Sequence, residues 1–72
     1  MKKRDLVKRI ADSARDRDVE WELVRRGANH DVYRLGGSII PVPRHNEIQE
    51  RTAEGILKEC QSVLGEKWWQ GK

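Results

Sequence analysis

The chain has little cysteine and histidine and no long hydrophobic run. Its single cysteine, Cys60, excludes an internal disulfide bond, and one cysteine with two histidines leads us to expect no structural zinc site. No apolar run approaches the roughly 20 residues of a membrane span. Asp5, Lys8 and Arg9 interrupt the apolar stretch that a signal peptide needs. A chain of 72 residues buries one thin core, so function must lie on a surface or in a shallow groove.

Charge is what the chain has in abundance, with 15 Lys and Arg against 12 Asp and Glu. Residues 1–45 carry 11 basic and 7 acidic side chains, whereas residues 46–72 carry 4 and 5. Four arginines fall in the middle of the chain: Arg25, Arg26, Arg34 and Arg44. Within that stretch only Asp31 opposes them. Guanidinium groups pair with phosphate oxygens at two points, which favours a nucleic-acid partner; a solvated surface is the alternative.

Hydrophobic spacing predicts a helix, three strands and a second helix. Apolar residues at intervals of three and four predict the first helix over residues 5–15, with Asp5 as its N-cap. Alternation and turn residues predict strands at 19–23, 30–35 and 39–42, a loop at 25–29 and a tight turn at Gly36-Gly37-Ser38. The second helix is expected to begin at Thr52 and to end before Gly65. Gly55 within it suggests a close contact.

Two hairpins make the sheet antiparallel, and both helices have one apolar stripe. We therefore predict an α+β fold in the order α-β-β-β-α, with a three-stranded antiparallel sheet and two helices on one face. The expected core consists of Trp21, Leu23, Val32 or Tyr33, Ile40, Val42, Leu6, Ile10, Ile56 and Cys60. One domain is expected over residues 1–65, followed by a tail at 66–72.

The strand at 30–35 presents two faces, and the choice between them decides where His30 points. If Val32 faces inward, His30 and Arg34 are buried with it, which is costly in a small core. We therefore expect Tyr33 and Leu35 to face inward. His30 then lies at the strand start beside Arg25, Arg26 and Asn29 in the loop. Its imidazole is the best acid–base candidate; the alternative is an ordinary surface histidine.

Three further features carry weaker signals. His45 and Arg44 form either a phosphate-facing corner or simply a loop that leads into the second helix. Cys60 belongs to an apolar stripe and is expected to be a small core residue. Trp68 and Trp69 leave three alternatives open: the tail folds back on the domain, anchors a protein partner, or is disordered.

Two short motifs stand at the loop and at the entry to the last helix. Gly27-Ala28-Asn29-His30 leads into a strand, and Val42-Pro43-Arg44-His45 is followed by Glu47-Ile48. Together with the element order and the length, they resemble the HicA toxins of bacterial type II toxin–antitoxin systems over roughly residues 6–64. Two departures are that Ala28 stands where serine is common, and that Arg51-Thr52-Ala53 replaces the usual Gly-Thr-Leu.

The resemblance implies a fold similar to the double-stranded RNA-binding domain and a ribonuclease that cleaves mRNA to arrest translation and growth. His30 stands where the family has its catalytic histidine. The implied partner is a HicB-like antitoxin that covers the active site. The toxin–antitoxin assembly is dimeric or higher, and the sequence does not give its size. No metal, other cofactor or membrane is expected, and the location implied is the cytoplasm.

Metal-free RNA cleavage needs a base, an acid and cations on the phosphate. His30 supplies one proton transfer, and the other is open between His45 and a water bound to the substrate. The expected RNA- or phosphate-binding residues are Arg25, Arg26, Asn29, Arg34, Arg44 and His45. Weak sequence preference and steep salt dependence follow from such a surface. The alternatives are a non-catalytic RNA-binding module and an interaction domain that docks a partner through Trp68 and Trp69.

Overall fold

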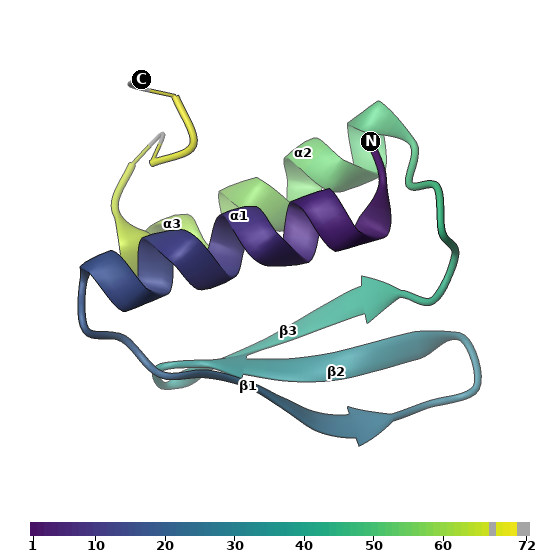
Figure 1. Cartoon of the computed structure of the whole chain (residues 1–72), viewed down its shortest axis with the longest axis horizontal. Helices are drawn as coiled ribbons and strands as arrows, with labels where there is room; N and C mark the ends of the chain where they lie inside the picture. Colours follow the sequence, from purple (N-terminus) through teal and green to yellow (C-terminus); the bar gives the residue numbers. More distant parts are fainter. Residues whose placement is uncertain (67, 71–72) are drawn as a thin grey trace.

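The computed structural model describes residues 1–66 and 68–70, and its elements follow the predicted order (Figure 1). They are α1 (Lys3–Asp16), β1 (Trp21–Arg26), β2 (His30–Leu35), β3 (Ser38–Pro43), α2 (Glu50–Glu59) and the short α3 (Gln61–Leu64). The strands form one antiparallel sheet in the order β1-β2-β3. Figure 1 shows the helices together on one face of this sheet. The predicted α+β fold is therefore confirmed, although the single helix expected up to Gly65 is divided at Cys60 into α2 and α3.

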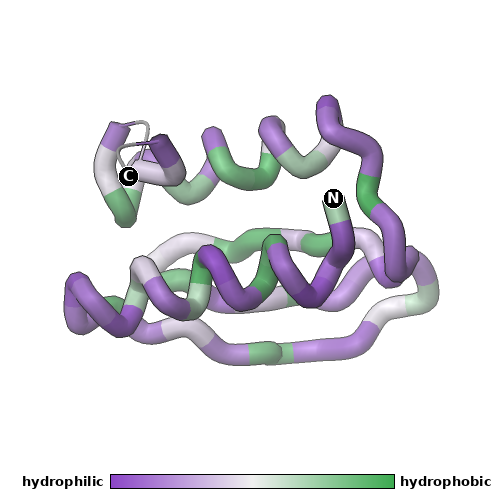
Figure 2. The backbone as a smooth tube through the Cα atoms, turned by 45° about the horizontal axis from the view of Figure 1, so that its top comes forward, coloured by the Kyte–Doolittle hydropathy of each residue, from purple (hydrophilic) through white to green (hydrophobic). Residues whose placement is uncertain are grey.

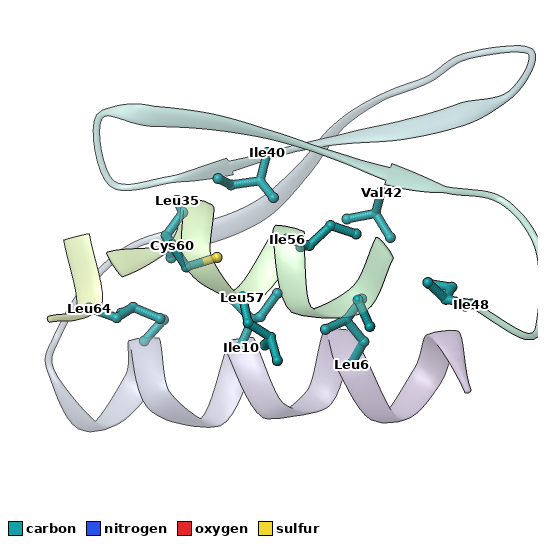
Figure 3. Close-up of a cluster of buried hydrophobic side chains, with 12 residues drawn as sticks. Leu6, Ile10, Leu35, Ile40, Val42, Ile48, Ile56, Leu57, Cys60 and Leu64 are labelled. Carbon is teal, nitrogen blue, oxygen red and sulfur yellow. The ribbon is translucent and has the colours of Figure 1, made fainter. Parts of the chain in front are cut away.

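The core fills the space between the helices and the sheet. Figure 3 shows side chains from α1 and α2 pointing toward side chains from β2 and β3. The largest fully buried ones are Leu6, Ile10, Leu35, Ile40, Val42 and Cys60. On β2 the inward face carries Leu35 and the half-buried Tyr33, as the register argument predicts. Burying these apolar surfaces is the main source of stability in a domain this small.

The edge strand β1 is less buried than predicted. Trp21 is half-buried and stacks on Tyr33 with ring centroids 4.4 Å apart. Leu23 was expected in the core, but 39% of it is exposed, so this prediction is wrong. Edge position alone is not the reason, because β3 is also an edge strand and buries Ile40 and Val42; α2 packs on β3, and Figure 1 and Figure 2 show β1 as the strand farthest from α2.

The boundaries of β1 also differ from the prediction of 19–23. The pairing with β2 shifts between Leu23 and Arg25, which leaves Val24 as an extra residue. Such a bulge interrupts strict alternation without ending the ladder, so the strand continues to Arg26. The loop therefore covers only residues 27–29, and Arg25 and Arg26 belong to the strand.

The start of α1 is set by a tertiary contact rather than by a side-chain cap. Asp5 was expected to be the N-cap, but the helix begins at Lys3 and no side chain caps it. The Lys3 N–H donates instead to the carbonyl oxygen of Asn46 at 2.8 Å. Asp5 lies in the first turn, where its negative charge suits the helix dipole. The predicted capping role of Asp5 is therefore wrong.

The second helix begins at Glu50, two residues before the expected N-cap Thr52. Ile48 is buried, and its N–H donates to the carbonyl oxygen of Met1 at 2.8 Å, while Glu47 pairs with Lys2 as an isolated bridge. These contacts hold the chain extended until just before the helix. A Cβ on Gly55 would meet no atom within 4 Å, so the expected close contact there is wrong.

The two tail tryptophans lie against the domain itself. The Trp68 indole Nε1–H donates to the carbonyl oxygen of Leu57 at 2.9 Å, and Trp69 meets the Trp68 ring edge to face. Both rings pack against the hydrophobic core. Of the three alternatives for this pair, the structure therefore shows the fold-back. None of the helices in the described residues has the length and apolar character that a membrane crossing requires.

Candidate nucleic-acid interface

Three segments that are distant in sequence meet at one end of the molecule (Figure 1). They are the β1–β2 loop, the exit from β3 and the start of α1. His30 pairs with Pro43 across the β2–β3 ladder, and the Arg44 N–H donates to the Asn29 carbonyl oxygen at 3.1 Å. The fold thus gathers most of the predicted site residues at this end: Arg25, Arg26, Asn29, His30, Arg44 and His45. We call it the loop end.

His30 is exposed on the sheet face that the helices leave open. It shares that face with Val32, two residues along β2. Arg25 pairs with Val32 across the ladder, so Arg25 and His30 lie on the same face. Arg26 pairs with Asp31 and lies on the helix side. The imidazole is therefore accessible to a large substrate and has an arginine on its own face.

The backbone of His30 is held by the glycine that begins the loop. The Gly27 N–H donates to the His30 carbonyl oxygen at 2.7 Å. A Cβ at Gly27 would lie 2.8 Å from that same oxygen, closer than real Cβ contacts allow. Glycine is therefore required here by close approach. This gives a physical reason for the glycine of the Gly27-Ala28-Asn29-His30 motif.

Asp31 is a buried carboxylate among cations, with 5% of its side chain exposed. Lys3 Nζ lies 2.5 Å from its Oδ2, and Arg44 Nε lies 3.4 Å from its Oδ1. The hydrogen bond from Lys3 is the main cause that lowers the pKa of Asp31, and the positive charges of Lys3, Arg44 and Arg26 add to it. Asp31 is therefore ionised at neutral pH. Its ion pair with Lys3 holds the start of α1 against the loop end.

Arg44 makes structural contacts that the sequence analysis does not predict. Besides its ion pair with Asp31, its Nη1 donates to the Gly27 carbonyl oxygen at 2.9 Å. The side chain is 44% exposed, so it lies at the boundary between the buried pair and the surface. Its contacts join the β3 exit to the β1–β2 loop, which directly precedes His30.

Arg34 is the predicted site residue that the fold does not bring to the loop end. It lies four residues from His30 along β2, a separation of about 13 Å at the rise of a strand. Its guanidinium pairs with Glu22 and lies 3.7 Å from a carboxylate oxygen of Glu20. These two acidic neighbours offset its charge, so Arg34 is not part of the candidate site.

A groove of about 470 Å³ runs beside the start of α1. Its walls are formed by Lys2, Lys3, Arg4, Val7, Tyr33 and Asn46.

Two residues at the loop end, Lys3 and Asp31, are not among the site residues expected from the sequence. The sequence signal for Asp31 was available, because the register that faces Tyr33 and Leu35 inward also turns Asp31 inward.

Two other kinds of chemistry have no support in the described part of the chain. Among residues 1–66 and 68–70, no group of three or more His, Cys, Asp or Glu side chains is placed to hold a metal ion. Cys60 is a buried free cysteine, as predicted. Burial raises the pKa of its thiol to about 12, which keeps it neutral and unreactive.

Comparisons of the chain with protein-family models, with curated proteins and with solved structures return no match. Functional inference therefore depends on the site residues themselves and on the two motifs described above.

Proposed function

We propose that the chain is the toxin of a type II toxin–antitoxin system, an endoribonuclease that cleaves mRNA in the cytoplasm and is held inactive by a HicB-like antitoxin. The observation that carries the proposal is the position of His30. It is the one exposed histidine that begins a strand, it lies on an open sheet face with Arg25, and Arg44 contacts the loop that precedes it. An RNA backbone needs this combination of a proton-transfer group and phosphate ligands.

The chemistry proposed is metal-independent attack within the RNA itself. A base removes the proton from a ribose 2′-OH, and the 2′-oxygen bonds to the adjacent phosphorus. The bond from phosphorus to the 5′-oxygen breaks, and that oxygen takes a proton from an acid. The products are a 2′,3′-cyclic phosphate and a 5′-OH. His30 carries one proton transfer, His45 or a water carries the other, and Arg25, on the same sheet face as His30, stabilises the charge on phosphate.

The two histidines of the chain make a matched pair for the test. His30→Ala should lower the rate of RNA cleavage by about 10²- to 10⁴-fold, the usual contribution of a general acid or base. His45→Ala has a smaller effect if a water supplies the second proton transfer. Cleavage is measured on a labelled single-stranded RNA with EDTA present, and a 2′-deoxy substitution at the cut position should block it. A His30→Ala variant that folds and cuts at the wild-type rate contradicts the proposal.

A second candidate is a non-catalytic RNA-binding module. The groove at the start of α1 favours it, because its walls carry Lys2, Lys3 and Arg4 but no histidine. In this case the purified chain would retard RNA in a gel and produce no cyclic-phosphate ends. The His30→Ala variant would bind the RNA as tightly as the wild type. Growth of cells that express the chain would then be unaffected by His30→Ala.

A further inference from the structure

We propose that Asp31 is a positioning residue that holds His30 in place through Arg44 and the β1–β2 loop. This inference rests on the proposed function, because it concerns the same site. Asp31 and His30 are neighbours in β2, so their side chains point to opposite faces of the sheet. Asp31 therefore acts on the backbone that carries the imidazole and takes no part in the chemistry itself.

Asp31 contacts two segments outside β2. Its Oδ2 accepts a hydrogen bond from Lys3 Nζ at the start of α1, and its Oδ1 faces Arg44 Nε at the exit from β3. The backbone supports the same junction, since the Lys3 N–H donates to the Asn46 carbonyl oxygen. One carboxylate thus ties the first helix to the chain that leaves the sheet.

Arg44 passes this constraint on to the loop. Its Nη1 donates to the Gly27 carbonyl oxygen at 2.9 Å, and its backbone N–H donates to the Asn29 carbonyl oxygen at 3.1 Å. The two bonds hold the first and the last residue of the loop. Gly27 in turn donates its N–H to the His30 carbonyl oxygen at 2.7 Å. The path from Asp31 to the His30 backbone therefore consists of one ion pair at 3.4 Å and two hydrogen bonds.

The same contacts give Arg44 a structural role in place of the phosphate-binding role expected from the sequence. As a phosphate ligand, it would contribute to substrate binding, and its loss would raise KM. As a strut between Asp31 and Gly27, it contributes to the placement of His30, and its loss lowers kcat. Displacement of a catalytic group by about 1 Å can cost about 10²-fold in rate, so a loosened loop is enough to impair cleavage.

The first test compares Asp31→Asn with Asp12→Asn in RNA cleavage by the full chain. Both variants remove one ion-paired carboxylate, but Asp12 lies on the exposed side of α1 and pairs with Lys8 and Arg15. Asp31→Asn should lower kcat by about 10- to 100-fold with little change in KM. Asp12→Asn should leave both constants unchanged. An equal loss in the two variants would mean a general charge effect and would overturn the inference.

A second variant covers the case in which Asp31→Asn does not fold. Arg44→Lys keeps the charge, but a lysine lacks the planar fork with which Arg44 contacts both Asp31 and Gly27. It should lower kcat while KM stays near the wild-type value. A rise in KM at constant kcat would identify Arg44 as a phosphate ligand and refute the strut.

A third measurement needs no catalysis and separates this inference from the proposed function. Hydrogen exchange of the Gly27 N–H, followed by NMR, reports whether its bond to His30 holds. Exchange should be faster in Asp31→Asn and Arg44→Lys than in Asp12→Asn. If the wild type cuts no RNA but this pattern holds, the proposed function fails and the positioning contact stands. If the folded variants exchange and cut like the wild type, the positioning role is refuted.

Discussion

Arginines lie in opposite surroundings at the two ends of β2. At the loop end a single buried carboxylate, Asp31, is surrounded by Lys3, Arg26 and Arg44. At the other end, beside the β2–β3 turn, Arg34 faces the carboxylates of Glu20 and Glu22. Cations exceed carboxylates around Asp31, whereas carboxylates exceed cations around Arg34. The same residue type therefore serves two different purposes at the two ends of one sheet.

Whether an arginine is available to bind phosphate therefore depends on its neighbours across the sheet. Exposed ion pairs contribute little to stability, but a nearby carboxylate does reduce the attraction that an arginine exerts on phosphate. Glu22 pairs with Arg34 in the β1–β2 ladder. The opposite partner of Arg25 is the apolar Val32. Cross-strand pairing thus separates an arginine available for phosphate from one that is already paired.

The largest difference between the two ends of the sheet is expected when a glycine in each hairpin is replaced. Gly27→Ala should lower the free energy of unfolding by about 1–3 kcal/mol, because the new Cβ would collide with the His30 carbonyl oxygen. Gly37→Ala, in the hairpin at the other end, should change it by less than about 0.5 kcal/mol, since a Cβ there meets nothing within 4 Å. Urea unfolding of both variants is the measurement. Equal losses would show that the loop end is not specially constrained.

A smaller effect is expected when the arginines are removed singly. Arg25→Gln should weaken RNA binding and reduce the slope of log affinity against log salt by about 0.7, the value for one phosphate contact on single-stranded RNA. Arg34→Gln should leave that slope unchanged, because Glu20 and Glu22 already offset its charge. Fluorescence anisotropy at several salt concentrations measures both. A larger change for Arg34→Gln would reverse the assignment of the two ends.

The smallest expected effect is a gain in stability at Gly55 in α2, away from both ends of the sheet. Gly55→Ala should raise the free energy of unfolding by about 0.5–1 kcal/mol, because alanine is the better helix former and its Cβ meets open space. In a domain of this size, 1 kcal/mol shifts Tm by about 4–8 °C. Thermal unfolding by circular dichroism is the measurement. A decrease in Tm would contradict the exposed position of Gly55, and a gain provides a stable background for the weaker loop-end variants.

Much of the fold could be predicted from local patterns. Apolar spacing located α1 and the second helix, and Gly36-Gly37 located the β2–β3 turn, where Gly36 has a φ of +58°. The register of β2 followed from the cost of burying His30 and Arg34. Starts of helices were less predictable, since Asn46 and Met1 supply partners from distant parts of the chain. A bulge at Val24 likewise leaves no clear sign in a short alternating segment.

The candidate site could be predicted as a set of residues but not as an arrangement. Each arginine in the middle of the chain looks alike in sequence, and only the ladder shows that Arg34 pairs with Glu22 while Arg25 does not. Lys3 was missed because the contact it makes with Asp31 joins residues 28 positions apart. Local patterns carry no information about such a pair.

Local patterns are enough to predict the α+β order, the buried place of Cys60 and the position of His30 at the start of a strand, because periodicity and turn residues act over a few positions. Three features depend on long-range packing: the burial of Asp31 between Lys3 and Arg44, the separation of Arg34 from the other cations, and the docking of Trp68 on Leu57. A desolvated charge or indole N–H must find a partner, and packing selects that partner from distant segments.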